Sequence, residues 1–264
     1  MGKYSELLVI IEQKVGVGGR MAVAFSGGVD SSLVAKAAVD AGADVLAITV
    51  DSPLFSRRDM EIASAVAEET GIRHVVVKSD YIPKNNIKRC YQCKKNMARL
   101  WKETAGNEGF HVVADGVTID DINDIHRPGV GASTGENIWH PLADAGFTAE
   151  DVVNAAKEAG LSVWNRPSNS CLASRISYGE EITPKKLGMV EEAEEFLHDL
   201  PGAVRVRMHN DIARIEVVPG NFEKILERRE EVVKTFRKIG FVHIVLDMDG
   251  YRSGSMNDGI MPFP

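Results

Sequence analysis

The residues best suited to chemistry lie in one short stretch, residues 22–32, with the sequence Ala-Val-Ala-Phe-Ser-Gly-Gly-Val-Asp-Ser-Ser. Residues 21–25 form an apolar run that predicts a buried strand. A turn at Ser26-Gly27-Gly28 follows, and Asp30 and Ser31 suit a helix start because their oxygens accept unpaired N–H groups. A helix start offers N–H donors at the positive end of a dipole, and glycines let a phosphate approach the backbone. The stretch therefore predicts an anion-binding loop.

The loop differs from two common phosphate-binding motifs. A Walker loop needs a lysine after its second glycine, and a dinucleotide fingerprint needs Gly-x-Gly-x-x-Gly. The loop instead resembles the pyrophosphate loop (PP-loop) of the ATP pyrophosphatase superfamily, Ser-Gly-Gly-x-Asp-Ser, which implies cleavage of ATP between its α- and β-phosphates. The alternative is a tight turn without a ligand. We expect ATP to contact Ala24, Ser26, Gly27, Gly28, Asp30, Ser31 and Ser32.

Polar residues also follow two other predicted strands. Thr49 and Asp51 end the strand predicted over residues 44–50, beside the first loop, where adenosine could bind. Asp115 and Gly116 end the strand predicted over residues 111–114, and two more aspartates follow at 120 and 121. Carboxylates beside a triphosphate are natural Mg²⁺ ligands. The sequence predicts a nucleotide site with Mg²⁺ nearby but does not single out the carboxylate that binds it. A polar strand exit and a solvated acidic loop are the plainer alternatives.

The chain has three cysteines, Cys90, Cys93 and Cys171. The first two form a Cys-x-x-Cys pair at the start of a helix predicted over residues 90–106. The helix dipole and neighbouring Arg89 and Lys94 should lower their thiol pKa values. A zinc site would need a histidine as well. A [4Fe–4S] cluster on three cysteines would leave one iron open. Two surface thiols and one buried thiol are the alternative.

Four arginines could bind an anionic group. Arg205 and Arg207 lie two residues apart on a predicted strand, Arg214 lies on its partner strand, and Arg252 stands in a Gly-Tyr-Arg-Ser-Gly segment. Converging guanidinium groups suit bidentate capture of phosphate or carboxylate. Any one of them alone would be interpreted as an ordinary surface arginine.

Composition excludes several classes of protein. The chain has 264 residues and a formal net charge of −7, and it lacks a dense basic tract for nucleic acid. No apolar run reaches the 18 or so residues of a membrane span, and the N-terminal residues lack a signal-peptide core. We expect a cytoplasmic protein that binds neither nucleic acid nor membrane. Cysteines there more often serve metal or sulfur chemistry than disulfides.

The predicted elements must hold these residues at one edge of a sheet. Helices over residues 3–15, 57–70 and 149–159 alternate with strands over 21–25, 44–50, 74–77 and 111–114. This alternation predicts an α/β fold, a doubly wound parallel sheet whose ligands bind at the carboxyl ends of the strands. Residues 116–146 and 161–181 are interpreted as irregular. The predicted PP-loop domain covers residues 1–180.

The pattern changes after residue 180. Pro184 in the first turn predicts a helix up to about residue 200. Strands over residues 204–208 and 213–217 predict a hairpin, followed by a helix over 221–239 and a strand over 242–246. We expect a small α+β domain over residues 181–264 with an antiparallel sheet. It would serve substrate binding or oligomerisation.

Together these motifs resemble one family. They include Ser-Gly-Gly-Val-Asp-Ser-Ser, Arg-Cys-Tyr-Gln-Cys-Lys, Asp-Gly-Val-Thr-Ile-Asp-Asp, Cys-Leu-Ala-Ser-Arg-Ile-Ser-Tyr-Gly, Val-Arg-Val-Arg-Met-His and Gly-Tyr-Arg-Ser-Gly-Ser, and they span nearly the whole chain. The chain is similar to the LarE family of ATP-dependent sulfur transferases, which make the nickel-pincer nucleotide cofactor of lactate racemase. The resemblance implies a substrate, pyridinium-3,5-biscarboxylic acid mononucleotide, that ATP adenylates before sulfur replaces AMP as a thiocarboxylate forms.

The resemblance also implies roles for individual residues. Asp30 would be catalytic within the PP-loop, and Arg205, Arg207 and Arg252 would meet the substrate phosphate. Cys171 matches a sulfur-bearing cysteine that some members convert to dehydroalanine. Members with three cysteines hold [4Fe–4S], so Cys90 and Cys93 favour an external sulfide donor over sacrifice of Cys171. The family also implies a homotrimer or homohexamer.

Three other functions stay open at this point. A tRNA thiolase of the same superfamily would need a basic face or an RNA-binding module. An amide ligase would need a source of ammonia. A nucleotide-binding iron–sulfur carrier without turnover would need neither the carboxylates nor the arginines.

Overall fold

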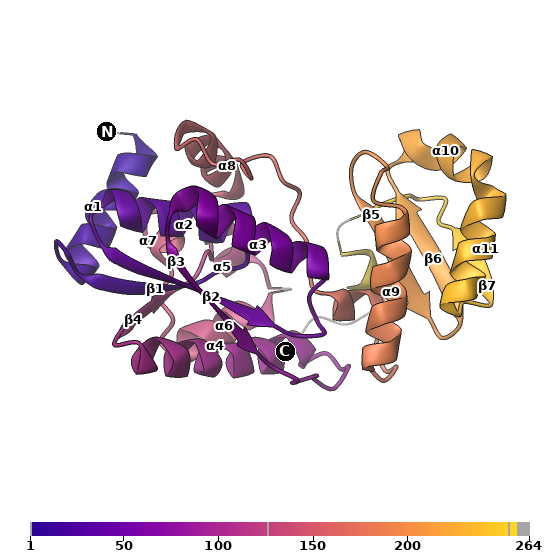
Figure 1. Cartoon of the computed structure of the whole chain (residues 1–264), viewed down its shortest axis with the longest axis horizontal. Coiled ribbons are helices and arrows are strands. Elements are labelled where there is room, and N and C mark those ends of the chain that lie inside the picture. The colour runs from indigo at the N-terminus through magenta and orange to yellow at the C-terminus, as the bar shows by residue number, and fades with distance from the viewer. Residues whose placement is uncertain (1, 126, 253, 258–264) are drawn as a thin grey trace.

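The computed structural model describes residues 2–125, 127–252 and 254–257. Two sheets lie side by side along the long axis of the molecule (Figure 1). The strands are β1 (Arg20–Ala24), β2 (Asp44–Asp51), β3 (Arg73–Lys78), β4 (Val112–Ala114), β5 (Val204–His209), β6 (Ile212–Val217) and β7 (His243–Leu246). The helices are α1 (Lys3–Val15), α2 (Val29–Asp40), α3 (Arg57–Thr70), α4 (Arg89–Asn107), α5 (Ile119–Asn123), α6 (Pro128–Gly135), α7 (Pro141–Asp144), α8 (Ala149–Glu158), α9 (Pro184–Phe196), α10 (Phe222–Glu227) and α11 (Arg229–Ile239).

The first sheet has the strand order β3-β2-β1-β4, and every pair is parallel. Successive side chains of β1 point to opposite faces. Met21 and Val23 join the core formed with α1, α2, α3 and α8, whereas Ala22 and Ala24 join the core formed with α4. Helices on both faces confirm the predicted doubly wound α/β fold of the PP-loop type, and the strands carry the apolar runs that a sheet buried on both faces requires.

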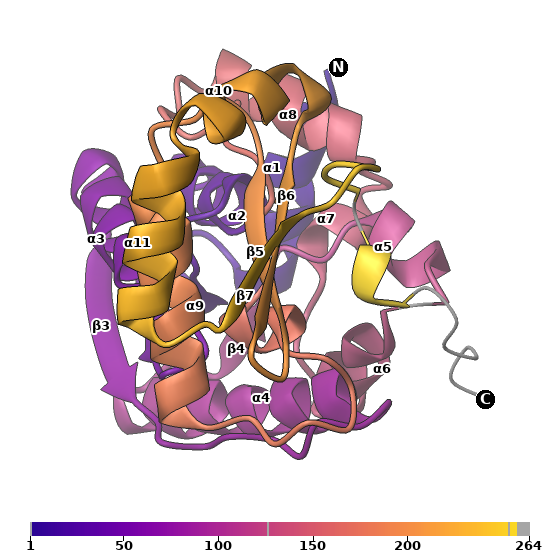
Figure 2. The same ribbon diagram turned by 90° about the vertical axis from the view of Figure 1, so that its right-hand side faces the viewer.

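The second sheet has the order β5-β6-β7. Its predicted hairpin is confirmed: β5 and β6 are antiparallel, and Asn210 in the turn has a φ of 55°. The prediction of a wholly antiparallel sheet is wrong, because β7 pairs parallel to β6. The chain returns through α10 and α11, and such a crossover brings the next strand in along the same direction. The helix predicted over 221–239 is two helices that meet at Arg228. Helices α9 and α11 lie beside this sheet (Figure 2).

The interpretation of residues 116–146 as irregular is also wrong, because α5, α6 and α7 lie there. Their signals are short and local. Thr118 and Asp121 form a capping box at the start of α5, and Pro128 and Pro141 stand in the first turns of α6 and α7. Helices of four to eight residues are too short to give a clear apolar period.

The core of the second sheet also includes side chains from earlier in the chain. Leu54, Leu172 and Ile176 pack with β5, β6 and α9. Ile176 also forms a bridge with Met208. The domain boundary at residue 180 stays a prediction, and residues 258–264 of the second predicted domain lie outside the described residues. Within the described part of the chain, no helix combines the length and apolar character that crossing a membrane requires.

Candidate active site

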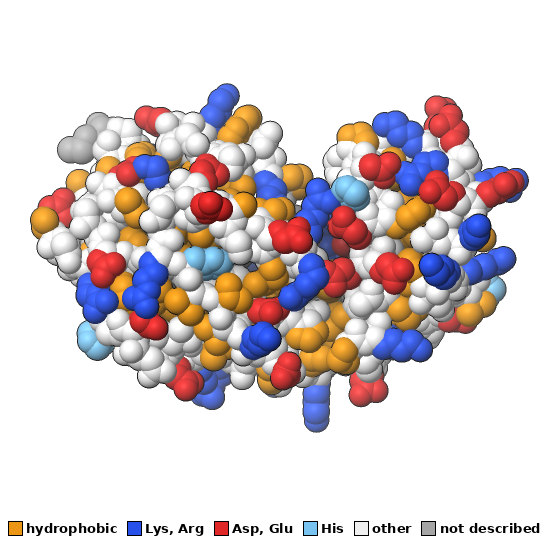
Figure 3. Space-filling view, viewed as in Figure 1, with side chains coloured by type: hydrophobic (Ala, Val, Ile, Leu, Met, Phe, Trp, Pro, Cys, Tyr) orange, Lys and Arg blue, Asp and Glu red, His pale blue; other side chains and the backbone are white. Residues whose placement is uncertain are grey.

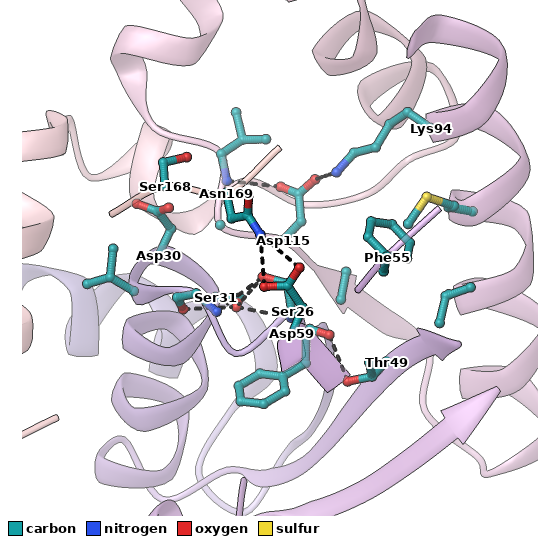
Figure 4. A pocket seen from close by; sticks show the side chains of 18 of the residues that line it. Ser26, Asp30, Ser31, Thr49, Phe55, Asp59, Lys94, Asp115, Ser168 and Asn169 are labelled. Carbon is teal, nitrogen blue, oxygen red and sulfur yellow. Dashed lines mark hydrogen bonds and ion pairs between the residues drawn. The ribbon is translucent and has the colours of Figure 1, made fainter. Parts of the chain in front are cut away.

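A cavity of about 400 Å³ lies at the carboxyl ends of the first sheet's strands (Figure 4). Its lining comes from the β1–α2 loop, the end of β2, the N-terminal part of α3, α4, the β4 exit and residues 166–169. The molecular surface is hollowed between the two lobes, where basic and acidic side chains gather (Figure 3). The sheet therefore presents its ligand-binding edge as doubly wound folds do.

Gly27 fixes the shape of the PP-loop. Its φ is +68°, a conformation that disfavours any residue with a Cβ. A Cβ here would also lie 2.5 Å from the Cα of Ala63 in α3. Gly28 is the N-cap of α2, and no side chain caps that helix. The loop thus packs against α3 and leaves the first turn of α2 available to an anion.

Two serines brace the loop from within. The Ser26 backbone N–H donates to Ser31 Oγ at 3.2 Å, and the Gly28 N–H donates to Ser26 Oγ at 3.3 Å. Gly116, at the exit of β4, touches the same helix start. A Cβ on Gly116 would lie 2.7 Å from both Asp30 Cβ and the Ser31 backbone nitrogen. Glycine is needed there because two chain segments come too close for a side chain.

Most of the predicted ATP-contacting residues line the cavity, namely Ala24, Ser26, Gly28, Asp30, Ser31, Thr49 and Gly116. The remaining three lie behind or beside it. Gly27 packs against Ala63, and Ser32 is buried with its Oγ unpaired among the described residues. Asp51 forms an ion pair of 2.7 Å with Arg57 and is not part of the lining.

Asp30 and Asp121 are two acids of the cavity that repel each other. Burial, and then repulsion from Asp121, raises the pKa of Asp30 to about 6. Asp121 has its own partner, an ion pair with Arg127. A divalent cation bound with ATP would relieve the repulsion, because Mg²⁺ prefers carboxylate oxygen. No group of three or more metal-ligating side chains occurs in the described ranges, so phosphate oxygens and water would complete such a site.

The Asp115 carboxylate already has two side-chain partners within the protein, so it is not available to a metal ion in the same way. It is buried, and it pairs with Lys94 at 3.1 Å and with His140 Nδ1 at 2.7 Å. Burial alone would raise the pKa of Asp115, but Lys94 and His140 outweigh it and bring the pKa to about 2. Asp115 therefore acts as a fixed anion that holds Lys94 at the cavity wall.

The opposite wall depends on an ion pair that the sequence analysis missed. Arg166 donates to Asp59 Oδ1 at 2.5 Å, and the Asn169 amide donates to Asp59 Oδ2 at 2.9 Å. Burial tends to raise the pKa of Asp59, but hydrogen bonds from Ser56, Asn169 and Arg166 lower it overall. These contacts fasten residues 166–169 to α3. The one local signal was Ser56 three residues before Asp59, a helix start in which Ser56 accepts from the Asp59 N–H.

Cys93 and Cys171 pack against the same core although they come from distant parts of the sequence, but the three thiols do not form a metal-ligating group among the described residues. Cys90 and Cys93 lie in the first turns of α4, and Cys171 is the N-cap of a short 3₁₀ helix, Leu172–Arg175. The pKa of Cys93 is raised to about 12 by burial and by the nearby Cys171 and Cys90. The prediction of a lowered thiol pKa is wrong for both cysteines of α4, because burial raises the pKa of Cys90 as well. Burial outweighs the basic neighbours, which have other partners: Arg89 bonds to Asn85, and Lys94 pairs with Asp115.

Arg175 anchors the segment that carries Cys171. It is fully buried and pairs with Glu194 of α9 at 2.9 Å. The same guanidinium donates to the Cys171 carbonyl oxygen at 3.0 Å and to Asn169 Oδ1 at 2.8 Å. One arginine thus positions both Cys171 and a residue of the cavity wall. The motif Cys-Leu-Ala-Ser-Arg contains this arginine, but no local pattern pointed to its partner, Glu194.

The predicted phosphate-binding arginines have different surroundings. Arg207 is buried and pairs with the buried Glu216 at 3.0 Å, and Arg214 pairs with the other oxygen of that carboxylate at 2.9 Å. Arg205 donates to the Ser168 carbonyl at 3.2 Å, directly behind the cavity wall. Arg252 lies 3.6 Å from Asp249, with its side chain half exposed.

Comparison with known proteins places this geometry in a family. The family model "Queuosine biosynthesis protein QueC" matches residues 20–108, which include the PP-loop. A tRNA-specific 2-thiouridylase of Treponema denticola is 26% identical over 220 residues, covering 66% of this chain and 60% of that protein. An uncharacterized protein of Synechocystis is 38% identical over 247 residues, covering 90% of this chain and 92% of that protein.

A further relative carries a functional name. The pyridinium-3,5-bisthiocarboxylic acid mononucleotide synthase of Lactiplantibacillus plantarum is 37% identical over 247 residues, covering 90% of this chain and 89% of that enzyme. The match extends well beyond the PP-loop and includes the segments that hold the three cysteines and the buried arginines. The chain therefore belongs to the family of this synthase, the LarE family of PP-loop sulfurtransferases.

Proposed function

We propose that the protein is an ATP-dependent sulfurtransferase acting on pyridinium-3,5-biscarboxylic acid mononucleotide. The observation that carries the proposal is the connection between two parts of the cavity. The PP-loop forms one side of it, and residues 166–169, which lead to Cys171, form another. Adenylation and sulfur transfer need such neighbouring groups, because the activated carboxylate must meet sulfur before water.

In the first step, a substrate carboxylate oxygen attacks the α-phosphorus of ATP. The bond to the β-phosphate oxygen breaks, and pyrophosphate leaves with that electron pair. The first-turn N–H groups of α2 would bind the departing phosphates. Asp30 with Asp121 would hold Mg²⁺, and Lys94, which lines the cavity, would approach the α-phosphate.

In the second step, hydrosulfide adds to the acyl carbon, and AMP leaves with the acyl–oxygen electron pair. The product is a thiocarboxylate. Cys90, Cys93 and Cys171 supply thiol donors of the type that iron prefers, and Cys93 and Cys171 pack against the same core. The three thiols do not form a metal-ligating group in the described residues, so binding a cluster would have to draw them closer together. When bound on three thiolates, a [4Fe–4S] cluster would offer one open iron to hydrosulfide from an external donor. The alternative is transfer of the Cys171 sulfur itself.

Arg205, Arg207 and Arg252 remain the proposed contacts of the substrate phosphate. Arg205 is the best supported, since Ser168, whose carbonyl it binds, lines the cavity. We also propose two domains divided near residue 180, with the preceding Leu172, Ala173 and Ile176 packed in the core of the second one. We further propose a cytoplasmic location and assembly as a homotrimer or homohexamer. Strand β7 lies at the edge of the second sheet, and exposed apolar side chains lie at and around it: Val242, Val245 and Met248. In such an assembly a neighbouring subunit would cover this apolar surface.

Anaerobic turnover with ATP, the pyridinium nucleotide and sulfide tests the sulfur route. We expect several thiocarboxylates per protein, iron and sulfide in the purified protein, and an unchanged mass at Cys171. Conversion of Cys171 to dehydroalanine, a loss of about 34 Da as H₂S, in metal-free protein would contradict the cluster route.

Two rivals are tested in the same assay. Similarity to a tRNA thiouridylase raises the possibility of tRNA as substrate, which the net charge of −7 disfavours. Replacing the pyridinium nucleotide by bulk tRNA should give no pyrophosphate. A carrier without turnover would release no pyrophosphate with either compound.

A further inference from the structure

Arg89, the first residue of α4, stands directly before Cys90 and is only 4% exposed. Its Nη1 donates to the Ala173 carbonyl oxygen at 3.0 Å. Ala173 follows Cys171 by two residues in a segment 84 residues away in sequence. A single guanidinium therefore ties the segment holding two cysteines to the segment holding the third.

Asn85 completes this tie. Arg89 Nη1 also donates to Asn85 Oδ1, and the Asn85 amide donates to the carbonyls of Ser177 at 2.7 Å and Glu180 at 2.8 Å. Asn85 is buried, so each of these bonds replaces a lost bond to water. The approach to α4 is thus fastened to residues 173–180 at several points.

The shape of the guanidinium matters here. Its Cζ lies 4.6 Å from the centre of the Tyr178 ring, a cation–π contact, while Nη1 serves the two oxygen acceptors. Its Nε, although buried, has no hydrogen-bond partner among the described residues. A lysine could not reproduce a planar group that stacks on an aromatic ring and bonds two acceptors at once.

We propose that Arg89 is the positioning residue that holds the segment of Cys90 and Cys93 beside the segment of Cys171. The proposal deepens the proposed function, since it concerns how the shared thiol site is assembled. It differs from that function in being a property of the protein without bound iron. Arg89 fixes the relative position of the two segments before any ligand arrives, which reduces the entropy lost on binding one.

The test compares Arg89→Lys with Arg99→Lys, the same change on an exposed arginine of α4 that pairs with Glu136. Iron-free reduced protein is treated with dibromobimane, which becomes fluorescent when it bridges two thiols. Peptide mapping then measures bridges between Cys171 and either cysteine of α4. We expect Arg89→Lys to reduce the bridging rate about tenfold, as for one lost charge-assisted hydrogen bond. Arg99→Lys should match the wild type.

Two further measurements separate positioning from folding. ATP affinity of Arg89→Lys should stay within about twofold of the wild type, because the PP-loop is untouched. After anaerobic reconstitution, the variant should lose iron to a chelator faster than the wild type. If Arg89→Lys does not fold, the same bridging measurement is made on Asn85→Ala. A reduced bridging rate supports the proposed link between the two segments, and an unchanged rate overturns it.

The outcomes distinguish the two proposals. If the wild-type protein binds no iron but thiol bridging still depends on Arg89, the cluster route is contradicted and the inference about Arg89 is supported. Equal bridging and equal iron retention in Arg89→Lys and wild type would overturn the inference while leaving the proposed function untouched.

Discussion

Asp30 is the cavity acid whose charge the folded protein stabilises least. Its pKa of about 6 in the folded protein lies above its ordinary value of 3.8. Between these two values the folded state binds more protons than the unfolded state, so stability falls as pH rises through this window. Above about pH 6, the folded protein bears the full free-energy cost of holding Asp30 ionised. The residue is thus arranged for a ligand cation and not for stability.

Asp30→Asn should accordingly stabilise the protein and inactivate it. We expect pyrophosphate release to be lost and the free energy of unfolding at pH 7.5 to rise by about 1–3 kcal/mol, from 1.36 kcal/mol per pKa unit. Denaturant titrations at pH 7.5 and pH 4 check this, since the difference should vanish near pH 4. Retention of normal pyrophosphate release by the variant would remove Asp30 from the mechanism.

The arginines require a test that separates binding from folding. Among the described residues, Arg207→Ala would leave buried Glu216 with Arg214 and Ser255 as partners, and we expect a loss of about 3 kcal/mol or more in unfolding free energy. Arg252→Ala, at a half-exposed side chain, should change stability by less than about 0.5 kcal/mol.

The same two variants test the substrate contact. Arg252→Ala should weaken binding of the pyridinium nucleotide by about 1.5–3 kcal/mol and leave the affinity for ATP unchanged, as measured by calorimetry. Unaltered affinity for the pyridinium nucleotide would exclude Arg252 as a phosphate ligand. Losses for both ligands in Arg207→Ala would reflect the damaged ion pair instead.

At the scale of elements, the loop between β1 and α2 depends on its first glycine more than its second. Gly27→Ala would place a Cβ 2.5 Å from the α3 backbone at a φ of +68°, and we expect a loss of about 2–4 kcal/mol. Gly28 has a φ of −78°, and a Cβ there would meet only Ser26 Oγ, at 3.3 Å. Gly28→Ala should therefore fold normally and bind ATP less tightly.

Thermal melts and ATP titrations of both variants provide the check. A Gly27→Ala protein as stable as the wild type would mean that α3 does not hold the loop. A Gly28→Ala protein with full ATP affinity would mean that the phosphates do not approach this backbone.

The sequence predicted well those elements whose characteristic residues form one continuous run. The PP-loop is a single run of residues between a strand and a helix, so its residue types and spacing report its shape directly. The contact between Asp59 and Arg166 joins residues 107 positions apart, and nothing local announces it. The prediction of lowered thiol pKa values was wrong for the same reason. Arg89 and Lys94 are neighbours of the cysteines in sequence, but their own side chains bond to distant acceptors.

At the scale of the whole molecule, the boundary between the two sheets can be tested with fragments. A fragment starting at residue 181 lacks Leu172, Ala173 and Ile176, which are buried in the core of the second sheet. We expect fragment 170–264 to give a cooperative thermal transition by circular dichroism. Fragment 181–264 should melt at a lower temperature or without cooperativity, because three buried apolar residues are missing. Identical transitions would support independent folding from residue 181.

The pairing of charges around the cavity also governs how fast a nucleotide arrives. Each cation in its lining has its own carboxylate: Lys94 with Asp115, Arg127 with Asp121, and Arg166 with Asp59. A cleft neutralised in this way has no net positive field to attract an anion from a distance, unlike sites that use electrostatic steering. The association rate of MgATP, followed by stopped-flow fluorescence, should vary by less than about threefold between 0.02 and 0.5 M salt. A steep decline with salt would mean that these ion pairs open before the nucleotide enters.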